Sequence, residues 1–251
     1  MRYSTRLIGR RTIAVDAIEI TVEKPRGYSF RAGQYAVLAI PDYNADSYVR
    51  EFSIANAPHE KTLEFAMRLR DSSFKQALYS IPLGSELHLS NAEGVLRHVD
   101  EPVVWIAGGI GIVPMRSMLR DALQGQKALP VHLYVSNRTL ESTPYENEFR
   151  AYAKDITSFK YLPVLTRTAQ SGAMRRISLD YIGAETPDYH TRTYVIVGTR
   201  PFVASMREML LRAGIADGKI MHERFCGYTT HDLNSIRIQN EYQRTSNECS
   251  T

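Results

Sequence analysis

The chain has 251 residues, of which 43% are hydrophobic and 23% charged, proportions typical of a soluble globular protein. A net charge of +4 is too mild for a dedicated nucleic-acid binder, and the longest apolar run, Val103 to Met115, falls short of the ~20 residues that cross a bilayer. The two cysteines, Cys226 and Cys249, exclude a disulfide framework and any four-cysteine iron–sulfur cluster or zinc site held by this chain alone.

The first hundred residues have the pattern of short strands separated by turns. Residues 18–23 alternate apolar and polar side chains, and residues 63–69 place an apolar side chain at every second position. Glycines and prolines interrupt these runs at spacings typical of an antiparallel barrel or sandwich. We therefore predict an all-β domain over residues 1–100.

The pattern changes near residue 101, where strands begin to alternate with helices. Residues 103–107 form a continuous apolar run, which predicts a strand buried on both faces, and apolar residues at helical spacing follow from Met115 to Leu123. Further strands are predicted at 131–135, 160–165, 194–197 and 219–222, with helices around 145–153 and from Pro201. This alternation predicts an α/β domain with a doubly wound parallel sheet over residues 101–228. The polar residues 229–251 are predicted to form a flexible tail.

A glycine-rich turn joins the first buried strand to its helix. Gly108, Gly109 and Gly111 allow the backbone to approach a phosphate closely, at a helix N-terminus that offers unpaired N–H donors. Pro114 fits the first helical position, although the dinucleotide fingerprint has a third glycine there. A tight structural turn is the alternative, but the strand before and the helix after it favour nucleotide binding.

Five segments, in order across residues 30–228, together resemble the ferredoxin–NADP reductase family, specifically its single-chain flavin reductases without an iron–sulfur module. They are the flavin motif Arg50-Glu51-Phe52-Ser53, the pyrophosphate turn at 108–114, the ribose segment Ser136-Asn137-Arg138, the second nucleotide loop at 198–206 and the closing segment at 223–228. The resemblance implies an antiparallel, Greek-key-like β-barrel that binds FAD, followed by the α/β nucleotide domain.

The resemblance also implies roles at the flavin site. Phe52 offers a flat face to the flavin ring, the Ser53 hydroxyl can bond flavin N5, and Arg50 would clamp the flavin phosphates. The alternative is an ordinary strand with a core Phe and a solvated Arg. A second phosphate segment is expected from the following group, whose serines can equally cap a helix: Met67, Arg68, Ser72, Ser73 and Phe74.

The end of the second strand of the α/β half bears on the choice of nucleotide. Ser136 and Arg138 stand there, with no Asp or Glu, and Arg167 follows the next strand as a possible second contact. Hydroxyl and guanidinium donors suit a 2′-phosphate, whereas an NADH enzyme usually has a carboxylate on the ribose. NADPH is therefore predicted over NADH, with a solvated Arg as the alternative.

The closing segment supplies the second candidate catalytic residue beside Ser53. Glu223 is expected to transfer a proton or to gate the site, with a generic surface Glu as the alternative, and Phe225 and Tyr228 are expected to pack near the ring edge or in the core. Two departures from the family pattern bear on nucleotide affinity more than on fold. They are Val113, where the family commonly has Thr, and Thr199, where it usually has Pro after Gly198.

The function implied is a reductase that takes a hydride from NADPH onto bound FAD and passes electrons to a separate acceptor. That acceptor would be ferredoxin, flavodoxin, an oxygenase component or a small molecule. Two alternatives remain: an NAD(P)H:flavin reductase that releases reduced flavin, and a non-catalytic flavin- or nucleotide-binding subunit.

The charge and the N-terminus set expectations for partners and location. The mild positive charge fits an acidic partner and equally fits none. The early arginines leave no room for the apolar core of a signal peptide. We therefore expect a cytoplasmic protein with no nucleic-acid partner and no membrane span.

Overall fold

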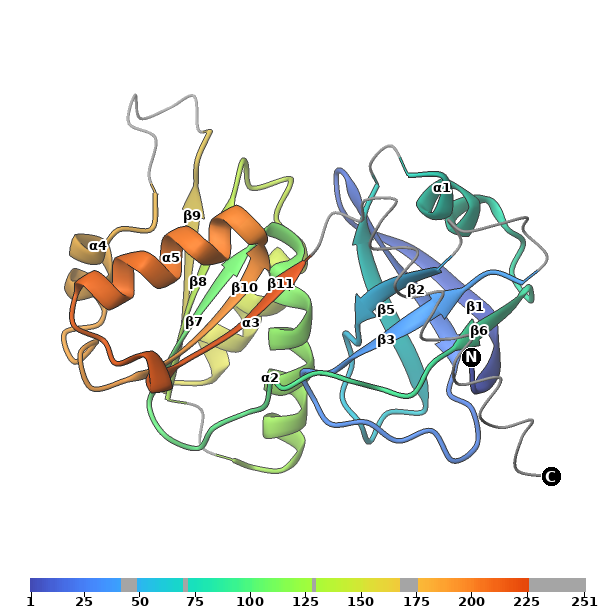
Figure 1. Cartoon of the computed structure of the whole chain (residues 1–251), viewed down its shortest axis with the longest axis horizontal. Helices are drawn as coiled ribbons and strands as arrows, with labels where there is room; N and C mark the ends of the chain where they lie inside the picture. Colours follow the sequence, from blue (N-terminus) through green and yellow to red (C-terminus); the bar gives the residue numbers. More distant parts are fainter. Residues whose placement is uncertain (42–48, 70–71, 128–129, 168–175, 226–251) are drawn as a thin grey trace, which may run out of the picture.

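The computed structural model describes residues 1–41, 49–69, 72–127, 130–167 and 176–225. Two sheets stand beside each other, one antiparallel and one parallel, with helix α2 (Val113–Gln124) between them (Figure 1). The boundary predicted near residue 100 falls between the last strand of the first sheet and the first strand of the second. The predicted tail at 229–251 and Tyr228 lie outside the described residues.

The antiparallel sheet holds six strands in the order β4-β3-β6-β1-β2-β5. Their bounds are β1 Tyr3–Ala14, β2 Ala17–Glu23, β3 Tyr35–Ala39, β4 Val49–Ser53, β5 Thr62–Arg68 and β6 Glu86–Leu89. Helix α1 (Ser73–Ser80) covers one end of the sheet (Figure 1). Because β6 inserts between β3 and β1, the strand order has the non-sequential character of a Greek key. The predicted antiparallel β fold is confirmed.

The closure of this sheet is less complete than the predicted barrel. The edge strands β4 and β5 approach through the isolated bridge between Ile54 and Phe65, and no continuous ladder joins them among the described residues. The chain diverges just after β4, where the Ile54 N–H bonds Gln34 and the Ala55 N–H bonds Glu64. The sheet is therefore a strongly curved, incompletely closed barrel around an apolar core.

The parallel sheet holds five strands in the order β11-β10-β7-β8-β9. Its elements are β7 Val103–Gly108, β8 Val131–Asn137, α3 Glu146–Asp155, β9 Phe159–Leu165, α4 Leu179–Glu185, β10 Thr193–Thr199, α5 Arg200–Arg212 and β11 Ile220–Phe225. Two short 3₁₀ helices, η1 (Gly109–Ile112) and η2 (Asp217–Lys219), precede α2 and β11. The predicted doubly wound sheet is confirmed.

Strand β7 shows why its apolar run is continuous. Val103 and Trp105 pack on the side of α2 and α3, whereas Val104 and Ile106 pack on the side of α4 and α5, and all four are fully buried. The strand order reverses between β7 and β10, so the carboxyl ends of these two strands flank a crevice. The glycine-rich turn follows β7 at this position.

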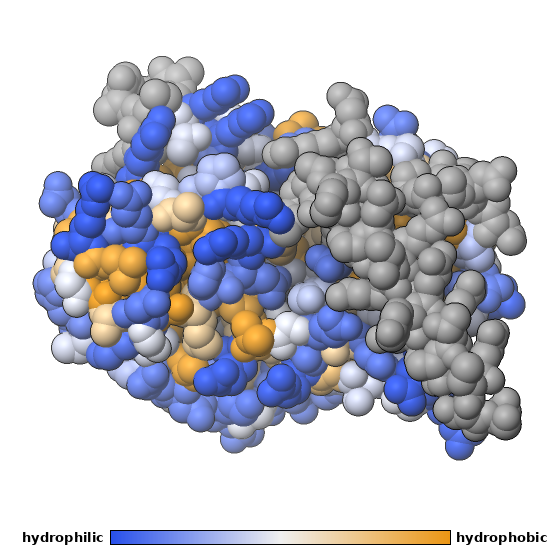
Figure 2. Space-filling model, viewed as in Figure 1, coloured by the Kyte–Doolittle hydropathy of each residue, from blue (hydrophilic) through white to orange (hydrophobic). Residues whose placement is uncertain are grey.

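The surface seen in Figure 2 is mainly hydrophilic, with small apolar patches over the half of the molecule that holds α4 and α5. Within the described ranges, no helix combines the length and the apolar character that a membrane crossing requires.

Candidate functional site

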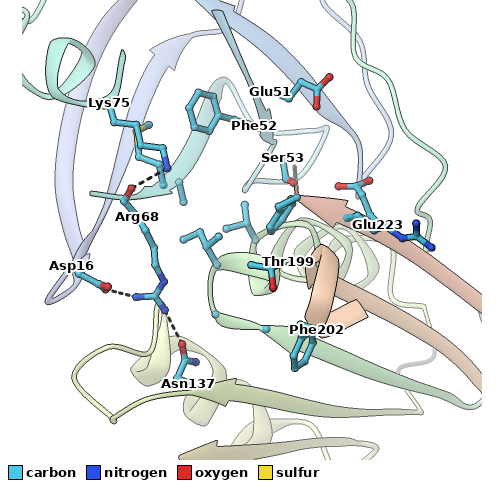
Figure 3. A pocket seen from close by; sticks show the side chains of 18 of the residues that line it. Asp16, Glu51, Phe52, Ser53, Arg68, Lys75, Asn137, Thr199, Phe202 and Glu223 are labelled. Carbon is cyan, nitrogen blue, oxygen red and sulfur yellow. Dashed lines mark hydrogen bonds and ion pairs between the residues drawn. The ribbon is translucent and has the colours of Figure 1, made fainter. Parts of the chain in front are cut away.

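A cleft of about 1070 Å³ lies where the carboxyl ends of the parallel strands face the antiparallel sheet (Figure 3). Most of the site residues predicted from the sequence line it: Arg50, Phe52, Ser53, Met67, Arg68, Ser72, Ser73, Gly108, Gly109, Val113, Ser136, Arg138, Glu223 and Phe225. The structure therefore brings side chains from β4, β5 and α1 together with the turn that follows β7.

The glycine turn forms one wall of the cleft. Gly109 has φ +59°, in the left-handed region that favours glycine. Gly108 and Gly109 face the cleft, whereas Gly111 packs behind them, where a Cβ would lie 2.3 Å from the carbonyl oxygen of Val197. Pro114 is buried in the first turn of α2. The turn thus presents backbone to the cleft and has no room for side chains behind it.

The end of β4 forms the opposite wall. Phe52 and Ser53 are buried, and the Phe52 ring stacks on Phe74 with 5.9 Å between ring centroids. Phe74 is fully buried and does not line the cleft, so it supports Phe52 from behind. The Arg50 guanidinium lies 5.8 Å from the Phe74 ring centroid and reaches the cleft.

Three cleft side chains carry a buried polar atom that has no hydrogen-bond partner among the described residues: Ser53 Oγ, Ser72 Oγ and Asn137 Nδ2. A buried donor without a partner costs free energy unless a ligand or water satisfies it. Ser72 is the residue before α1, whose N-terminus also offers backbone N–H groups. These atoms and the glycine cradle fit a flavin on the β4 wall and a dinucleotide on the glycine turn.

Arg68 crosses the cleft from the antiparallel to the parallel sheet. Its guanidinium donates to Asp16, to Asn137 Oδ1 at 2.8 Å and to the Ser142 carbonyl at 2.9 Å. A Cβ on Gly109 would lie 3.3 Å from Arg68 Nη2, so the charge lies directly against the glycine turn. In Figure 3 the Arg68 side chain points toward Asn137, away from Lys75.

Glu223, near the end of β11, lies in the cleft beside the β4 wall (Figure 3). Burial, together with the negative charge of Glu51, raises the pKa of the Glu223 carboxyl to about 7, and the nearby Ser53 hydroxyl acts in the opposite direction. The same surroundings raise the pKa of Tyr35 to about 12, chiefly through burial and the charge of Glu51. Glu223 is therefore a carboxyl group that can hold a proton near neutral pH.

The ends of β8 and β9 form the edge at which a ribose is expected. Ser136 and Arg138 line the cleft there, and the Arg167 N–H bonds the Arg138 carbonyl at 2.8 Å, so the two exposed arginines sit on adjacent strand ends. Arg167 itself is outside the cleft lining. Among the residues that the structure describes, the carboxylates that line the cleft are Asp16, Glu51 and Glu223, and β8 and β9 contribute none of them.

Several cleft residues had no assigned role in the sequence analysis. Phe202, in α5, lies within the predicted nucleotide loop at 198–206 but had no role of its own there, and its ring lies against the glycines at the crevice, because Cβ atoms on Gly108 and Gly198 would approach it within 2.8 and 2.7 Å. Gly198 is thus packed behind this ring. Asp16 comes from the β1–β2 turn and Lys75 from α1. They line the cleft because segments that are distant in the sequence pack together there.

Comparison with known proteins agrees with this architecture. Residues 105–208 match the family model for an oxidoreductase NAD-binding domain. The chain is 26% identical over 222 residues to the reductase component of propane 2-monooxygenase from Rhodococcus jostii, covering 83% of this chain and 59% of that protein. It therefore spans less than two thirds of that relative's length.

A second relative and a solved structure cover more of their own lengths. Ferredoxin–NADP reductase B from Sorangium cellulosum is 26% identical over 195 residues, which cover 75% of this chain and 78% of that protein. A ferredoxin NADP⁺ reductase from Neisseria gonorrhoeae, solved with bound FAD and NADP, superimposes with a TM-score of 0.75 at 22% identity, covering 88% of this chain and 98% of that one. The chain therefore contains an oxidoreductase NAD-binding domain, is similar in sequence to a ferredoxin–NADP reductase and shares the two-domain fold of such enzymes.

Proposed function

We propose that this protein is an NADPH-dependent flavoprotein reductase that reduces bound FAD and passes the electrons to a separate acceptor. The observation that carries the proposal is the cleft itself, where the buried Ser53 hydroxyl faces a glycine turn that presents bare backbone. The relatives that match include a monooxygenase reductase component and a ferredoxin–NADP reductase, which supports transfer to a separate protein.

Side chains of the antiparallel sheet would hold the flavin. When bound, the flavin supplies an acceptor for two electrons that can pass them on singly or in pairs. Phe52 would cover the ring with its supporting Phe74 behind it, and Ser53 would donate a hydrogen bond to it. Arg50 and the N-terminus of α1, with Ser72 and Ser73, would bind the phosphates.

Residues of the parallel sheet, together with Arg68, would hold the nucleotide. The backbone of the glycine turn would approach the pyrophosphate, and Arg68 lies against Gly109 on that same side. We therefore assign Arg68 to the nucleotide in place of the flavin phosphate. Arg138 and Arg167, with the Ser136 hydroxyl, would bind a 2′-phosphate, which favours NADPH over NADH.

Glu223 would hold the additional proton that full reduction of the flavin takes up besides the hydride. A hydride brings two electrons and one proton, and full reduction of the flavin takes up one further proton. Glu223 is partly protonated near pH 7 because burial and the charge of Glu51 raise its pKa. The buried Phe52 and Val113 beside it would exclude water from the ring.

The test is anaerobic reduction of the purified protein by NADPH. We expect the protein to retain a yellow flavin that NADPH bleaches, and the reduced protein to pass electrons to a ferredoxin or an oxygenase component. A colourless protein that turns over added flavin would support the flavin reductase instead. A bound flavin that NADPH does not bleach would contradict both enzymatic functions.

A second experiment identifies the acceptor. Proteins captured from native lysate on the immobilised reductase would be tested in NADPH-driven cytochrome c reduction, with and without the captured protein. We expect the captured acceptor to accelerate this reduction, whereas captured proteins without any effect would contradict the proposed electron transfer.

A further inference from the structure

Arg116 is a buried charge outside the cleft, on α2 one turn beyond the glycine turn. Its side chain is only 3% exposed. Its Nε donates to both carboxylate oxygens of Glu148, at 2.9 and 2.8 Å, and Glu148 belongs to α3 of the same half of the molecule. Its Nη1 donates to Glu64 on β5 at 2.7 Å and to the Ala55 carbonyl at 3.1 Å. One guanidinium therefore bonds both halves of the molecule at once.

Further buried groups surround Arg116. Glu19 on β2, 1% exposed, lies 3.6 Å from Arg116 Nη1 and accepts a hydrogen bond from the Tyr145 hydroxyl at 2.8 Å. The Tyr145 ring centroid is 4.5 Å from the Arg116 guanidinium carbon. Burial alone disfavours the charge, but Tyr145, Glu148 and Glu64 raise the pKa of Arg116 above its ordinary value. Arg116 is thus a fixed cation held by partners on several elements.

The place of Arg116 in the chain connects the two walls of the cleft. It lies close after the glycine turn at 108–112, and its partner Ala55 stands two residues after Ser53. The next residue, Ser117, donates to the Asn56 carbonyl at 2.7 Å. The contact between α2 and the segment after β4 therefore sets how far the glycine turn lies from Phe52 and Ser53.

We propose that Arg116 is a positioning residue that sets the spacing between the nucleotide turn and the flavin wall through its bond to Glu64. The inference rests on the proposed function, because spacing matters only if a hydride crosses the cleft. Hydride transfer needs the reacting atoms about 3–3.5 Å apart, and a misplacement of 1 Å costs about 100-fold in rate. Separation of the halves would leave Arg116 and Glu19 as buried charges with fewer partners. The free-energy cost of losing these partners opposes a change in the spacing between the two walls.

The test compares two carboxylate partners of the same guanidinium. Glu64→Ala removes the partner across the interface, and Glu148→Ala removes the partner within the same half. We expect Glu64→Ala to lower the limiting rate of flavin reduction at saturating NADPH by about 100-fold. The dissociation constants for FAD and NADPH should change less than about threefold, since neither carboxylate lines the cleft. Glu148→Ala should keep a limiting rate within about threefold of the wild type.

Hydrogen exchange supplies a readout that does not depend on activity. Peptides covering residues 53–57 and 109–117 should exchange faster in Glu64→Ala, and at wild-type rates in Glu148→Ala. Equal limiting rates in the two variants, or a wild-type rate in Glu64→Ala, would overturn the positioning role. If Glu64→Ala fails to fold, Glu64→Gln retains the shape with a weakened bond, and a wild-type rate in that variant also refutes the role. Failure of wild-type flavin to be reduced by NADPH refutes the proposed function itself.

Discussion

The two walls of the cleft differ in the atoms that face it, which are backbone atoms on one wall and side-chain atoms on the other. The wall that follows β7 is backbone, with Gly108 and Gly109 facing the cleft and Gly111 packed against Val197. The wall at the end of β4 is side chain, with Phe52 and Ser53 supported by Phe74. A backbone site tolerates no added Cβ, whereas a side-chain site can lose a functional group and still fold. The two walls should therefore respond in opposite ways to small substitutions.

The largest effect is expected at the backbone wall. Gly111→Ala would place a Cβ 2.3 Å from the Val197 carbonyl oxygen, which is a backbone atom and cannot move aside as a flexible side chain could. We expect a loss of about 3 kcal/mol in the free energy of unfolding, together with weakened NADPH binding. Denaturant unfolding and nucleotide titration measure the two effects. Gly218→Ala is the matched control, because no atom lies within 4 Å of its added Cβ. Equal stability of the two variants would contradict the tight packing.

The next effect concerns the edge of the backbone wall, where we propose that side chains select the nucleotide. Arg138→Ala should raise the KM for NADPH about 10- to 100-fold, the worth of a charge-assisted hydrogen bond of about 1.5–3 kcal/mol, and leave the KM for NADH unchanged. Steady-state kinetics with both nucleotides measure this. Arg212→Ala, a surface arginine on α5 whose side chain is 79% exposed, serves as the control. Equal changes for NADPH and NADH would refute a 2′-phosphate contact.

The side-chain wall should lose function without losing stability. Ser53→Ala removes a buried hydroxyl that has no partner within hydrogen-bond geometry among the described residues and whose effect on the pKa of Glu223 is the smallest of the three that act on it, so the apoprotein should unfold at the same or a higher denaturant midpoint. The limiting rate of flavin reduction should fall about tenfold, equivalent to about 1.4 kcal/mol. Unfolding of the apoprotein and rapid-mixing kinetics of the flavin-bound protein separate the two. A destabilised apoprotein with an unchanged rate of flavin reduction would show that the Ser53 hydroxyl stabilises the fold and has no role in the reaction.

A further effect is a pH dependence of stability at the junction of the two walls. The pKa of Glu223 rises to about 7 on folding, chiefly through burial. The folded state therefore holds the proton more tightly than the unfolded one, and stability declines as pH rises from about 4.5 through 7. Glu223→Gln should unfold with a weaker dependence on pH between pH 5 and 8. Denaturant midpoints at both pH values measure the difference, and parallel curves for the two proteins would contradict a raised pKa.

The local elements of both halves follow from patterns of near neighbours in the sequence. The apolar run at 103–107 predicted β7, and the stripe from Met115 to Leu123 predicted α2, which spans Val113–Gln124. The turn at 108–111 was recognisable because close packing and a positive φ restrict a position to glycine. Such features depend on backbone geometry within a few residues, so the sequence alone contained them.

The direction of long side chains was not predictable in the same way. Arg68 was expected in the second flavin-phosphate segment, and the structure shows it lining the cleft, where it bonds Asn137, 69 residues away, and lies against Gly109. Phe74 was expected in the cofactor site and instead supports Phe52 from the core. Both outcomes depend on which element packs opposite, and no local pattern records that.

The sequence by itself determined an antiparallel β half, a parallel α/β half and the glycine turn that marks the nucleotide wall. Only the tertiary structure decided how the two walls face each other. The contact of Arg68 with Asn137 and the burial of Arg116 between Glu64 and Glu148 arise where the halves dock. The incomplete closure of the first sheet depends on how its own distant strands pair. Docking joins residues far apart in the chain, and its geometry is set by packing and by pairing of buried charges, which short-range sequence patterns do not encode.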